Sequence, residues 1–432
     1  MLHLSYENQL LLSCTRTEIS EDTRAKVKGL LKGSINWDEI LASASWHGIG
    51  PLLYNSLKSF QKTDSIPVEF MGKVKAAYYD TVARNMCLYA ELERILEAFD
   101  NGGIEVIILK GAALAQTVYG DIGLRPMSDI DLLVKKQALP DAERILYGAG
   151  YFLDERETSG WYQRNRHHHM NYIHQEKSVP VEIHWHIANK IHPSRIRDFD
   201  NEMIAEWRRG AMAVKISGRP VRILSPEDCI FHLCLHFLKH RYQNRYQGFG
   251  AGFTSRGALI QIHDIYQTIK HFSDQISWHR LRDRAEKYQI ANPVFMTLCI
   301  VKKIMEENGG TIGKILSGFT SKGGEREVVS IMCRKILIRE DSLSVVPPKI
   351  IQTQVSHSFQ EKARTLLRHL FPDRESMSQR YSIPLSSKRR FLYYMIRPFM
   401  LLFRYGRIVF EVPRIKEDAI LKRWMSGRGN EQ

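Results

Sequence analysis

The feature that most constrains the fold is where strands can form. Short apolar runs rich in β-branched residues lie between about residues 104 and 224, as in Ile104–Leu109 and Ile130–Val134. The sequence before and after this region repeats apolar residues every three or four positions, which is typical of amphipathic helices. We therefore expect a small α/β unit inside a mainly helical protein, with strands confined to this one region.

The chain of 432 residues is long enough for two or three structural units. Asn101-Gly102-Gly103 is expected to end the helix before the α/β core. The pattern predicts an N-terminal helical region (1–100), the α/β core (101–224), a helical domain (225–370) and a basic, aromatic C-terminal helical segment (371–432). Within the core, we expect a helix over Ala138–Gly148 and a β-hairpin joining His167–His174 to Val181–Ile187.

The charge of the chain is positive and uneven. Sixty-two Lys and Arg residues against 47 Asp and Glu give a formal charge of +15, and residues 351–432 hold 16 basic but only 7 acidic residues. Such a balance is compatible with nucleic acid, phosphate-rich ligands or an anionic membrane surface, and it selects none of them.

The cytoplasm is the expected location. No run approaches the roughly 20 apolar residues that cross a bilayer, and Arg397, Arg404 and Arg407 interrupt the nearest one, Phe391–Phe410. The N-terminus has Glu7 where a secretory signal would be basic. The six cysteines form no Cys-x-x-Cys pair, so we expect reduced thiols.

The segment MSDIDLLV, residues 127–134, carries the sharpest chemical pattern. Asp129 and Asp131 are two positions apart at the start of an apolar strand, so both carboxylates should point to one face. Close carboxylates repel each other and raise one pKa unless a cation holds them. Mg²⁺, a hard ion that prefers oxygen ligands, is the natural occupant.

A third carboxylate, Glu182, lies on the strand-like segment VPVEIHWHI, where His184 and His186 share its face. An isolated Asp-x-Asp is a loop or capping pair as often as it is a metal site. The neighbouring strand patterns favour a metal site made of Asp129, Asp131 and Glu182. His184 and His186 are candidates for contact with phosphate or acceptor, and a structural role beside Trp185 is the alternative for His184.

The turn at Lys110-Gly111 opens a helix and offers backbone N–H groups to phosphates. Gly111 lets the backbone approach closely, and Lys110 and Arg125 could neutralise a departing pyrophosphate. Together with the three carboxylates, this suits nucleotidyl transfer by two ions about 3.5–4 Å apart, one at the acceptor hydroxyl and one at the triphosphate. Asp129 and Asp131 would bind both ions, and Glu182 would complete the acceptor-side site.

The stretch VIILKGAALAQTVYGDIGLRPMSDIDLLV, followed by VEIHWHI, resembles the bacterial uncharacterised nucleotidyltransferase family within the polymerase-β-like nucleotidyltransferase superfamily. Looser similarity over the flanking helices extends the resemblance to about two-thirds of the chain. It implies an α+β fold with a small mixed sheet, an NTP donor and two Mg²⁺ ions, with Mn²⁺ as a possible substitute. It also implies Asp129, Asp131 and Glu182 as the catalytic carboxylates and Gly111 at the glycine turn.

This chain departs from the superfamily at that turn. Ala112 follows Gly111 where the superfamily usually has a serine or glycine, so the phosphate-binding set would be Lys110, Gly111, Ala112, Arg125 and Ser128. The resemblance leaves the acceptor open: a hydroxyl-bearing small molecule, a peptide or tRNA. Three interpretations of function therefore remain: a biosynthetic or peptide-tailoring transferase, a toxin or phage-defence transferase that modifies tRNA or protein, and a non-catalytic protein that binds nucleic acid or a membrane surface.

Other patterns favour structural roles. At most His167 and His169 of the triple histidine could share a site if neighbouring strand residues alternate, and a polar strand at the rim is the favoured interpretation. His232, His236 and His240 share a helical face without a carboxylate in reach, which favours partly buried structural histidines over zinc. Asp264 is expected to pair internally, with a substrate contact as the alternative.

Composition indicates the nature of two further segments. Gln247–Gly257 is Gly-rich but has no preceding strand, so we expect a mobile loop near the site rather than a phosphate-binding loop. The segment RRFLYYMIRPFMLLFRYGRIVF mixes aromatic residues with arginines. A docked helix pair kinked at Pro398 is favoured there, and a membrane surface or an RNA backbone is the alternative contact.

Overall fold

The computed structural model describes most of the first three-quarters of the chain and parts of the remainder. The described residues are 4–60, 65–156, 160, 163–164, 168–186, 201–244, 251–288, 290–305, 311–316, 325–339, 367, 370–372, 377, 387, 389–405, 417 and 420. They fall in two compact units, the first made of Met1–His192, Ile196–Phe237 and Gly257–Thr320, and the second of Pro193–Arg195, Leu238–Arg256 and Ser321–Gln432. The finer division into four segments stays a prediction.

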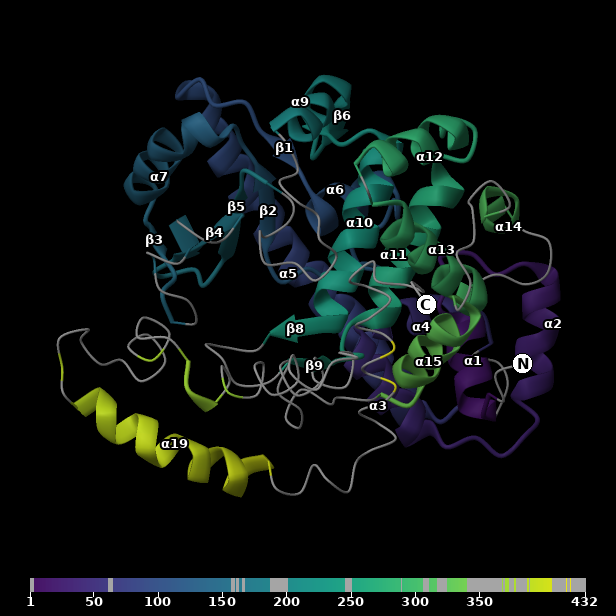
Figure 1. The fold of residues 1–432 in the computed structure, drawn as a ribbon. Helices are drawn as coiled ribbons and strands as arrows, with labels where there is room; N and C mark the ends of the chain where they lie inside the picture. The colour runs from purple at the N-terminus through teal and green to yellow at the C-terminus, as the bar shows by residue number, and fades with distance from the viewer. Residues whose placement is uncertain are drawn as a thin grey trace. The chain divides into compact units, whose positions relative to one another are not determined.

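The first unit begins with helices (Figure 1). They are α1 (Tyr6–Cys14), α2 (Glu21–Leu30), α3 (Trp37–His47), α4 (Gly50–Leu57), the short 3₁₀ helix η1 (Lys58–Phe60) and the 34-residue α5 (Val68–Asn101). Ser5, Ser20 and Asn36 cap α1, α2 and α3, because each side chain accepts a hydrogen bond from a first-turn amide. Helix α5 ends where the Asn-Gly-Gly sequence predicts, and Gly103 has a φ of 68°.

A seven-stranded sheet with the order β3-β4-β5-β2-β1-β7-β6 forms the α/β core. Its strands are β1 (Ile107–Ile108), β2 (Ile130–Leu133), β3 (Tyr151–Leu153), β4 (His169–His174), β5 (Pro180–His184), β6 (Met212–Ile216) and β7 (Arg219–Ile223). The pairs β2–β5 and β1–β7 are parallel and the others antiparallel. This mixed sheet confirms the predicted fold class, and β4 and β5 confirm the predicted hairpin. Strand β1 is shorter than the predicted Ile104–Leu109.

Helices cover the hydrophobic face of this sheet. Helix α6 (Lys110–Thr117) follows β1, and η2 (Lys136–Ala138) leads into α7 (Leu139–Gly148) after β2. The core cluster joins apolar side chains of α5 and α7 to Ile130 and Leu132 of β2 and to Val181 and Ile183 of β5. Because strand residues alternate between faces, Asp131 lies on the opposite face from Ile130 and Leu132.

The later part of the first unit is helical, as predicted. It contains α9 (Asn201–Gly210), most of α10 (Pro226–Arg241), α11 (Ala258–His271), α12 (Trp278–Lys287), α13 (Ala291–Met305) and α14 (Thr311–Leu316). The six cysteines are free thiols.

The second unit contains a further pair of strands, which corrects two predictions. Strands β8 (Tyr242–Asn244) and β9 (Ala251–Phe253) pair antiparallel, so strands are not confined to residues 104–224. The predicted loop over residues 247–257 is likewise wrong for 251–253, whereas 247–250 lie outside the described residues. A three-residue strand is too short to show a two-residue alternation, which explains why the sequence pattern did not indicate it.

The second unit also contains α15 (Glu325–Leu337) and α19 (Arg389–Tyr405). The fully buried Lys335 of α15 lies 3.7 Å from a carboxylate oxygen of Glu417, which also pairs with Arg334. Within the described part of the chain, no helix is both long and apolar enough to cross a membrane.

Candidate active site

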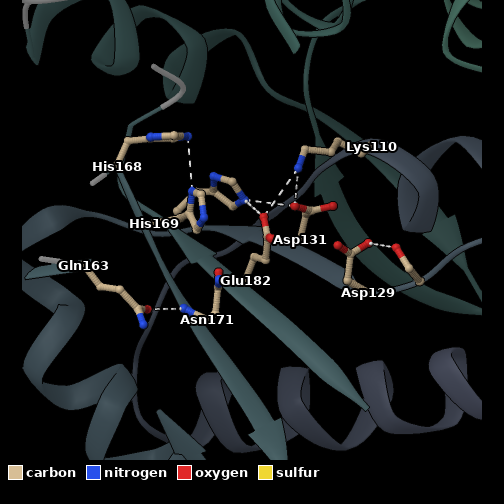
Figure 2. Close-up of polar contacts among 10 residues, drawn as sticks. Lys110, Asp129, Asp131, Gln163, His168, His169, Asn171 and Glu182 are labelled. Carbon is tan, nitrogen blue, oxygen red and sulfur yellow. Dashed lines mark hydrogen bonds and ion pairs between the residues drawn. The ribbon is translucent and has the colours of Figure 1, made fainter. Parts of the chain in front are cut away.

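Two of the predicted carboxylates lie side by side on adjacent strands. Strands β2 and β5 run parallel in a register that pairs Asp131 directly with Glu182, so the two side chains project from the same face of the sheet. Asp131 is 3% exposed and Glu182 is 22% exposed. Figure 2 shows the two carboxylates beside each other. The structure therefore brings a buried and a partly buried carboxylate together without a backbone bend.

Lys110 offsets one of the two negative charges of this pair. It is the first residue of α6 and adopts a left-handed backbone conformation with a φ of 49°. Its Nζ lies 2.5 Å from Asp131 Oδ1 and 3.6 Å from Glu182 Oε2. Burial opposes the charge of Lys110, but Asp131 and Glu182 outweigh it and raise its pKa above the usual value. Lys110 is thus a buried cation seated on the two carboxylates.

His184 contacts the same two carboxylates. Its Nε2 lies 2.9 Å from Asp131 Oδ1 and 3.1 Å from Glu182 Oε2, and its side chain is 2% exposed. Burial would raise the pKa of Glu182, but His169, Lys110 and His184 hold it well below the usual range. Glu182 is therefore an ionised acceptor. The ring of His184 lies at the two carboxylates, and its contact with phosphate or acceptor stays a prediction.

Asp129 lies next to this group, on the side away from His168 and His169 (Figure 2). Its Oδ1 accepts a hydrogen bond of 3.0 Å from the exposed Ser128 hydroxyl. Burial and then the negative charges of Asp131 and Glu182 raise the pKa of Asp129 to about 6. A raised pKa of this kind means that the positive charge near Asp129 does not compensate for burial and the neighbouring carboxylates.

The donor set fits a divalent ion. Asp131, Glu182 and His184 each offer a ligand atom, and these atoms lie within 4.8 Å of one another. Asp129 is not part of that group, although its pKa responds to the charges of both carboxylates. Carboxylate oxygens are the ligands that Mg²⁺ and Mn²⁺ prefer, and an excess of negative charge at Asp129 favours an added cation.

Lys110, Gly111 and Ala112 of the predicted phosphate-binding set form the start of α6, and packing contacts hold Gly111 and Ala112 there. A Cβ on Gly111 would lie 2.9 Å from both Arg125 Nη1 and Met127 Cγ, so this position needs glycine for close contact. Ala112 is buried, and its carbonyl accepts a 3.0 Å hydrogen bond from Tyr89. Packing alone therefore explains a glycine at position 111, in addition to any role of Gly111 in phosphate binding.

Arg125 is held by Asp264 of α11, which settles the expectation for Asp264 in favour of internal pairing. Arg125 Nε donates to Asp264 Oδ1 at 3.1 Å and Nη2 donates to Oδ2 at 2.6 Å. Nη1 donates to the Pro126 carbonyl at 2.6 Å. All three guanidinium nitrogens thus have protein partners, and Asp264 is 1% exposed.

Asp264 is also the end of a chain of hydrogen bonds that runs through Tyr119, His263 and Gln267. Tyr119 donates to Asp264 Oδ1 at 2.7 Å, so its oxygen can accept from His263 Nδ1 at 2.8 Å. Gln267 then lies 3.2 Å from His263 Nε2 and donates to it. Burial and the positive charges of Arg16 and Arg125 lower the pKa of His263 to about 3, which keeps its ring neutral. No sequence pattern indicated this network.

Three buried imidazoles gather beside Glu182. His169 of β4 is paired in register with His184 of β5, and His168 precedes β4. His168 Nε2 lies 3.1 Å from His169 Nδ1, and ring centroids of His169 and His184 are 4.9 Å apart. The expectation that neighbouring histidines face opposite sides is wrong for His168 and His169, because His168 lies in a bend before the strand begins. His167 lies outside the described residues.

His186 lies beyond the end of β5, so it does not continue the strand face of Glu182 as expected. Its backbone amide donates to the His168 carbonyl at 3.3 Å. In α10, the buried His232 packs 6.4 Å from Trp207 and 6.1 Å from His236 between ring centroids, which agrees with structural roles for these histidines.

Comparison with known proteins gives the family. The model of the uncharacterised nucleotidyltransferase family matches residues 33–306. No curated protein matches this chain. A solution structure of the antibiotic-resistance factor ANT(2'')-Ia aligns with 47% of this chain and 93% of that chain, at 16% identity and a TM-score of 0.30. The family match spans more than half of the chain and includes every strand of the seven-stranded sheet, and the chain belongs to the uncharacterised nucleotidyltransferase family.

Proposed function

We propose that this nucleotidyltransferase uses Mg²⁺ to move a nucleoside monophosphate from an NTP to a hydroxyl-bearing acceptor, with release of pyrophosphate. The observation that carries the proposal is the buried group of Asp131, Glu182 and Lys110, with Asp129 beside it. Three carboxylates at one place are what nucleotidyl transfer needs to hold divalent ions.

Asp129, Asp131 and Glu182 are the proposed metal ligands, with Mn²⁺ as a substitute for Mg²⁺. A bound divalent ion supplies Lewis-acid stabilisation of the reacting phosphate and makes the acceptor hydroxyl easier to deprotonate. The low pKa of Glu182 keeps this ligand ionised at neutral pH, and His184 fixes the orientation of Glu182 and Asp131 through its Nε2. In this role His184 is a positioning residue.

Lys110 would exchange partners when substrate binds. Its ammonium group pairs with Asp131, and a divalent ion bound at that carboxylate would take over the compensation of its charge. The released ammonium is then free to bind the triphosphate, together with the backbone amides of Gly111 and Ala112 at the start of α6. Ser128 is exposed beside Asp129 and could donate to the same phosphates. Because Asp264 neutralises Arg125, we assign Arg125 to shaping the Gly111 turn.

Calorimetry with ATP and divalent ions tests the proposal. We expect ATP binding that requires Mg²⁺ or Mn²⁺ and falls below detection in EDTA, because Asp131 and Glu182 repel phosphate when no ion lies between them. Glu69→Gln removes an exposed carboxylate of α5 far from the site and is the matched control, which should bind as the unaltered protein does. Equal ATP binding in EDTA would contradict the metal-dependent site.

The acceptor can be sought with the same protein. Each of the four NTPs is added with cell extract, and products carrying an added nucleoside monophosphate are identified by mass spectrometry. A modified small molecule or peptide would support a biosynthetic or tailoring role, whereas modified tRNA or protein would support the toxin or phage-defence alternative.

One observation favours an additional contact with an anionic membrane surface. Helix α19 exposes Phe391, Met395 and Phe399, at 67%, 74% and 74%, on one face at four-residue spacing. Its Arg397 is fully buried, and Tyr394 donates to the Pro372 carbonyl at 2.6 Å. A surface helix ordinarily buries its apolar face, but α19 exposes apolar side chains and buries an arginine. The exposed apolar side chains are therefore available to enter a lipid surface. The helix has no acidic residue, which suits anionic lipid rather than a neutral bilayer.

Vesicle sedimentation of the whole protein tests this contact. We expect binding to vesicles containing phosphatidylserine, weaker binding to phosphatidylcholine vesicles, and loss of binding in Met395→Glu/Phe399→Glu. Met86→Glu, at a position that is 60% exposed on α5, is the matched control and should bind normally. If the double variant binds the vesicles unchanged, or if it loses RNA binding instead, the membrane proposal is wrong.

A further inference from the structure

We propose that His168, His169 and His184 form a second metal site, for a transition ion such as Zn²⁺, behind the carboxylates of the proposed active site. All three side chains are buried, with 2%, 5% and 2% exposure. Each ring offers one nitrogen, and these nitrogens lie within 4.8 Å of one another. Three imidazoles gathered at this spacing are a ligand set typical of Zn²⁺ and unlike the oxygen ligands of Mg²⁺.

The hydrogen bonds of His184 determine which of its nitrogens can bind a metal. Both partners of Nε2, Asp131 Oδ1 and Glu182 Oε2, are carboxylate oxygens, which accept hydrogen bonds. Nε2 is therefore the nitrogen that donates to the carboxylates, and Nδ1 is the nitrogen left to face a metal ion. Among the described residues, this buried Nδ1 has no hydrogen-bond partner. A buried acceptor without a partner costs free energy, and a metal ion would relieve that cost.

This arrangement matches a recurring feature of metal centres. A histidine that binds a metal through one nitrogen commonly donates its other N–H to a carboxylate, which orients the ring and makes it a stronger ligand. Here the carboxylates that would orient His184 are Asp131 and Glu182. His184 would thus connect the two sites: Nδ1 as a zinc ligand, and Nε2–H as a donor to the magnesium ligands.

The other two ligands lie where the sheet holds them. His169 is directly opposite His184 in the β4–β5 pair, and the Trp185 amide donates to the His168 carbonyl at 3.1 Å, which fixes the backbone of His168 against the end of β5. His168 Nε2 and His169 Nδ1 lie 3.1 Å apart, within hydrogen-bond distance. A metal ion held there would form a metal–nitrogen bond to each of these rings, and the carboxylates nearby would add favourable charge.

Metal analysis of the whole protein without nucleotide tests the inference. Protein loaded with Zn²⁺ and dialysed should retain one zinc per chain, and Co²⁺ in its place should give the strong visible absorption of a tetrahedral site. We expect His168→Gln/His169→Gln to weaken zinc binding by at least about 100-fold, since loss of even an orienting partner costs 10–100-fold. His279→Gln removes an exposed imidazole from α12 and should retain zinc.

The outcomes separate this site from the proposed active site. Weak cobalt absorption typical of an octahedral oxygen site, unchanged in His168→Gln/His169→Gln, would assign the ion to the carboxylates and overturn the inference. Absence of bound zinc in the unaltered protein would overturn it as well. If the double variant fails to fold, as judged by circular dichroism, the single His168→Gln variant gives the same test because His168 precedes the strand. Magnesium-dependent ATP binding is measured separately, so either site can fail without the other.

Discussion

Asp131→Asn is expected to abolish nucleotide transfer while the sheet stays folded. Asparagine keeps the shape of the side chain, and the backbone of β2 still pairs with β5. The substitution removes the charge that would hold the divalent ions. A metal ion contributes several kcal/mol to the stabilisation of such a transition state, so the loss of turnover should be about a thousandfold or more.

The measurement is pyrophosphate release with the NTP and extract that give a product, comparing Asp131→Asn with the unaltered protein and with Glu69→Gln. Circular dichroism and urea unfolding establish that the variant is folded. Lys110 retains Glu182 as a partner in the variant, at 3.6 Å in the present structure, so its buried charge is not left alone. Turnover in Asp131→Asn near that of the control would exclude Asp131 from the catalytic machinery.

Asp264→Ala is expected to lower the free energy of unfolding by about 3–5 kcal/mol, because it leaves the charge of a largely buried arginine without its partner. Arg125 is 14% exposed and donates two hydrogen bonds to Asp264, and Tyr119 donates a third. Removing one partner of an exposed ion pair should cost much less, since such pairs contribute only about 0–1 kcal/mol.

Urea unfolding of the whole protein measures this effect. Asp274→Ala, at an exposed position shortly after α11, is the control and should change the free energy of unfolding by less than about 0.5 kcal/mol. The double variant Arg125→Met/Asp264→Leu should recover much of the loss, because no buried charge is then left unpaired. If Asp264→Ala unfolds at the same urea concentration as the control, the ion pair is not what joins α11 to the turn.

The sequence could predict those parts of the fold that depend on neighbouring residues. Two-residue alternation indicated β2, β4 and β5, and Asn101-Gly102-Gly103 indicated the end of α5. The histidine cluster could not be predicted in this way, because its geometry depends on where β4 begins. Strand β4 begins at His169, so the alternation of strand faces does not extend to His168, and the face predicted for His168 was wrong.

Long-range pairing set the remaining geometry of the candidate site. Arg125 and Asp264 are 139 positions apart, and no local pattern connects them. The parallel register of β2 and β5 likewise decides that Asp131 faces Glu182, and a shift of one residue would move Glu182 to the opposite face of the sheet. The sequence therefore predicted which residue types form the site but not which of them are already engaged by protein partners.

The ion pair between Lys110 and Asp131 has a thermodynamic consequence. A tethered ammonium group competes with any divalent ion for the same carboxylates, so an ion that arrives alone must displace it without giving it a new partner. A triphosphate supplies that partner. Ion and nucleotide are therefore expected to bind with positive coupling, each raising the affinity for the other by the same factor. Such coupling would disfavour the binding of free magnesium until the nucleotide is present.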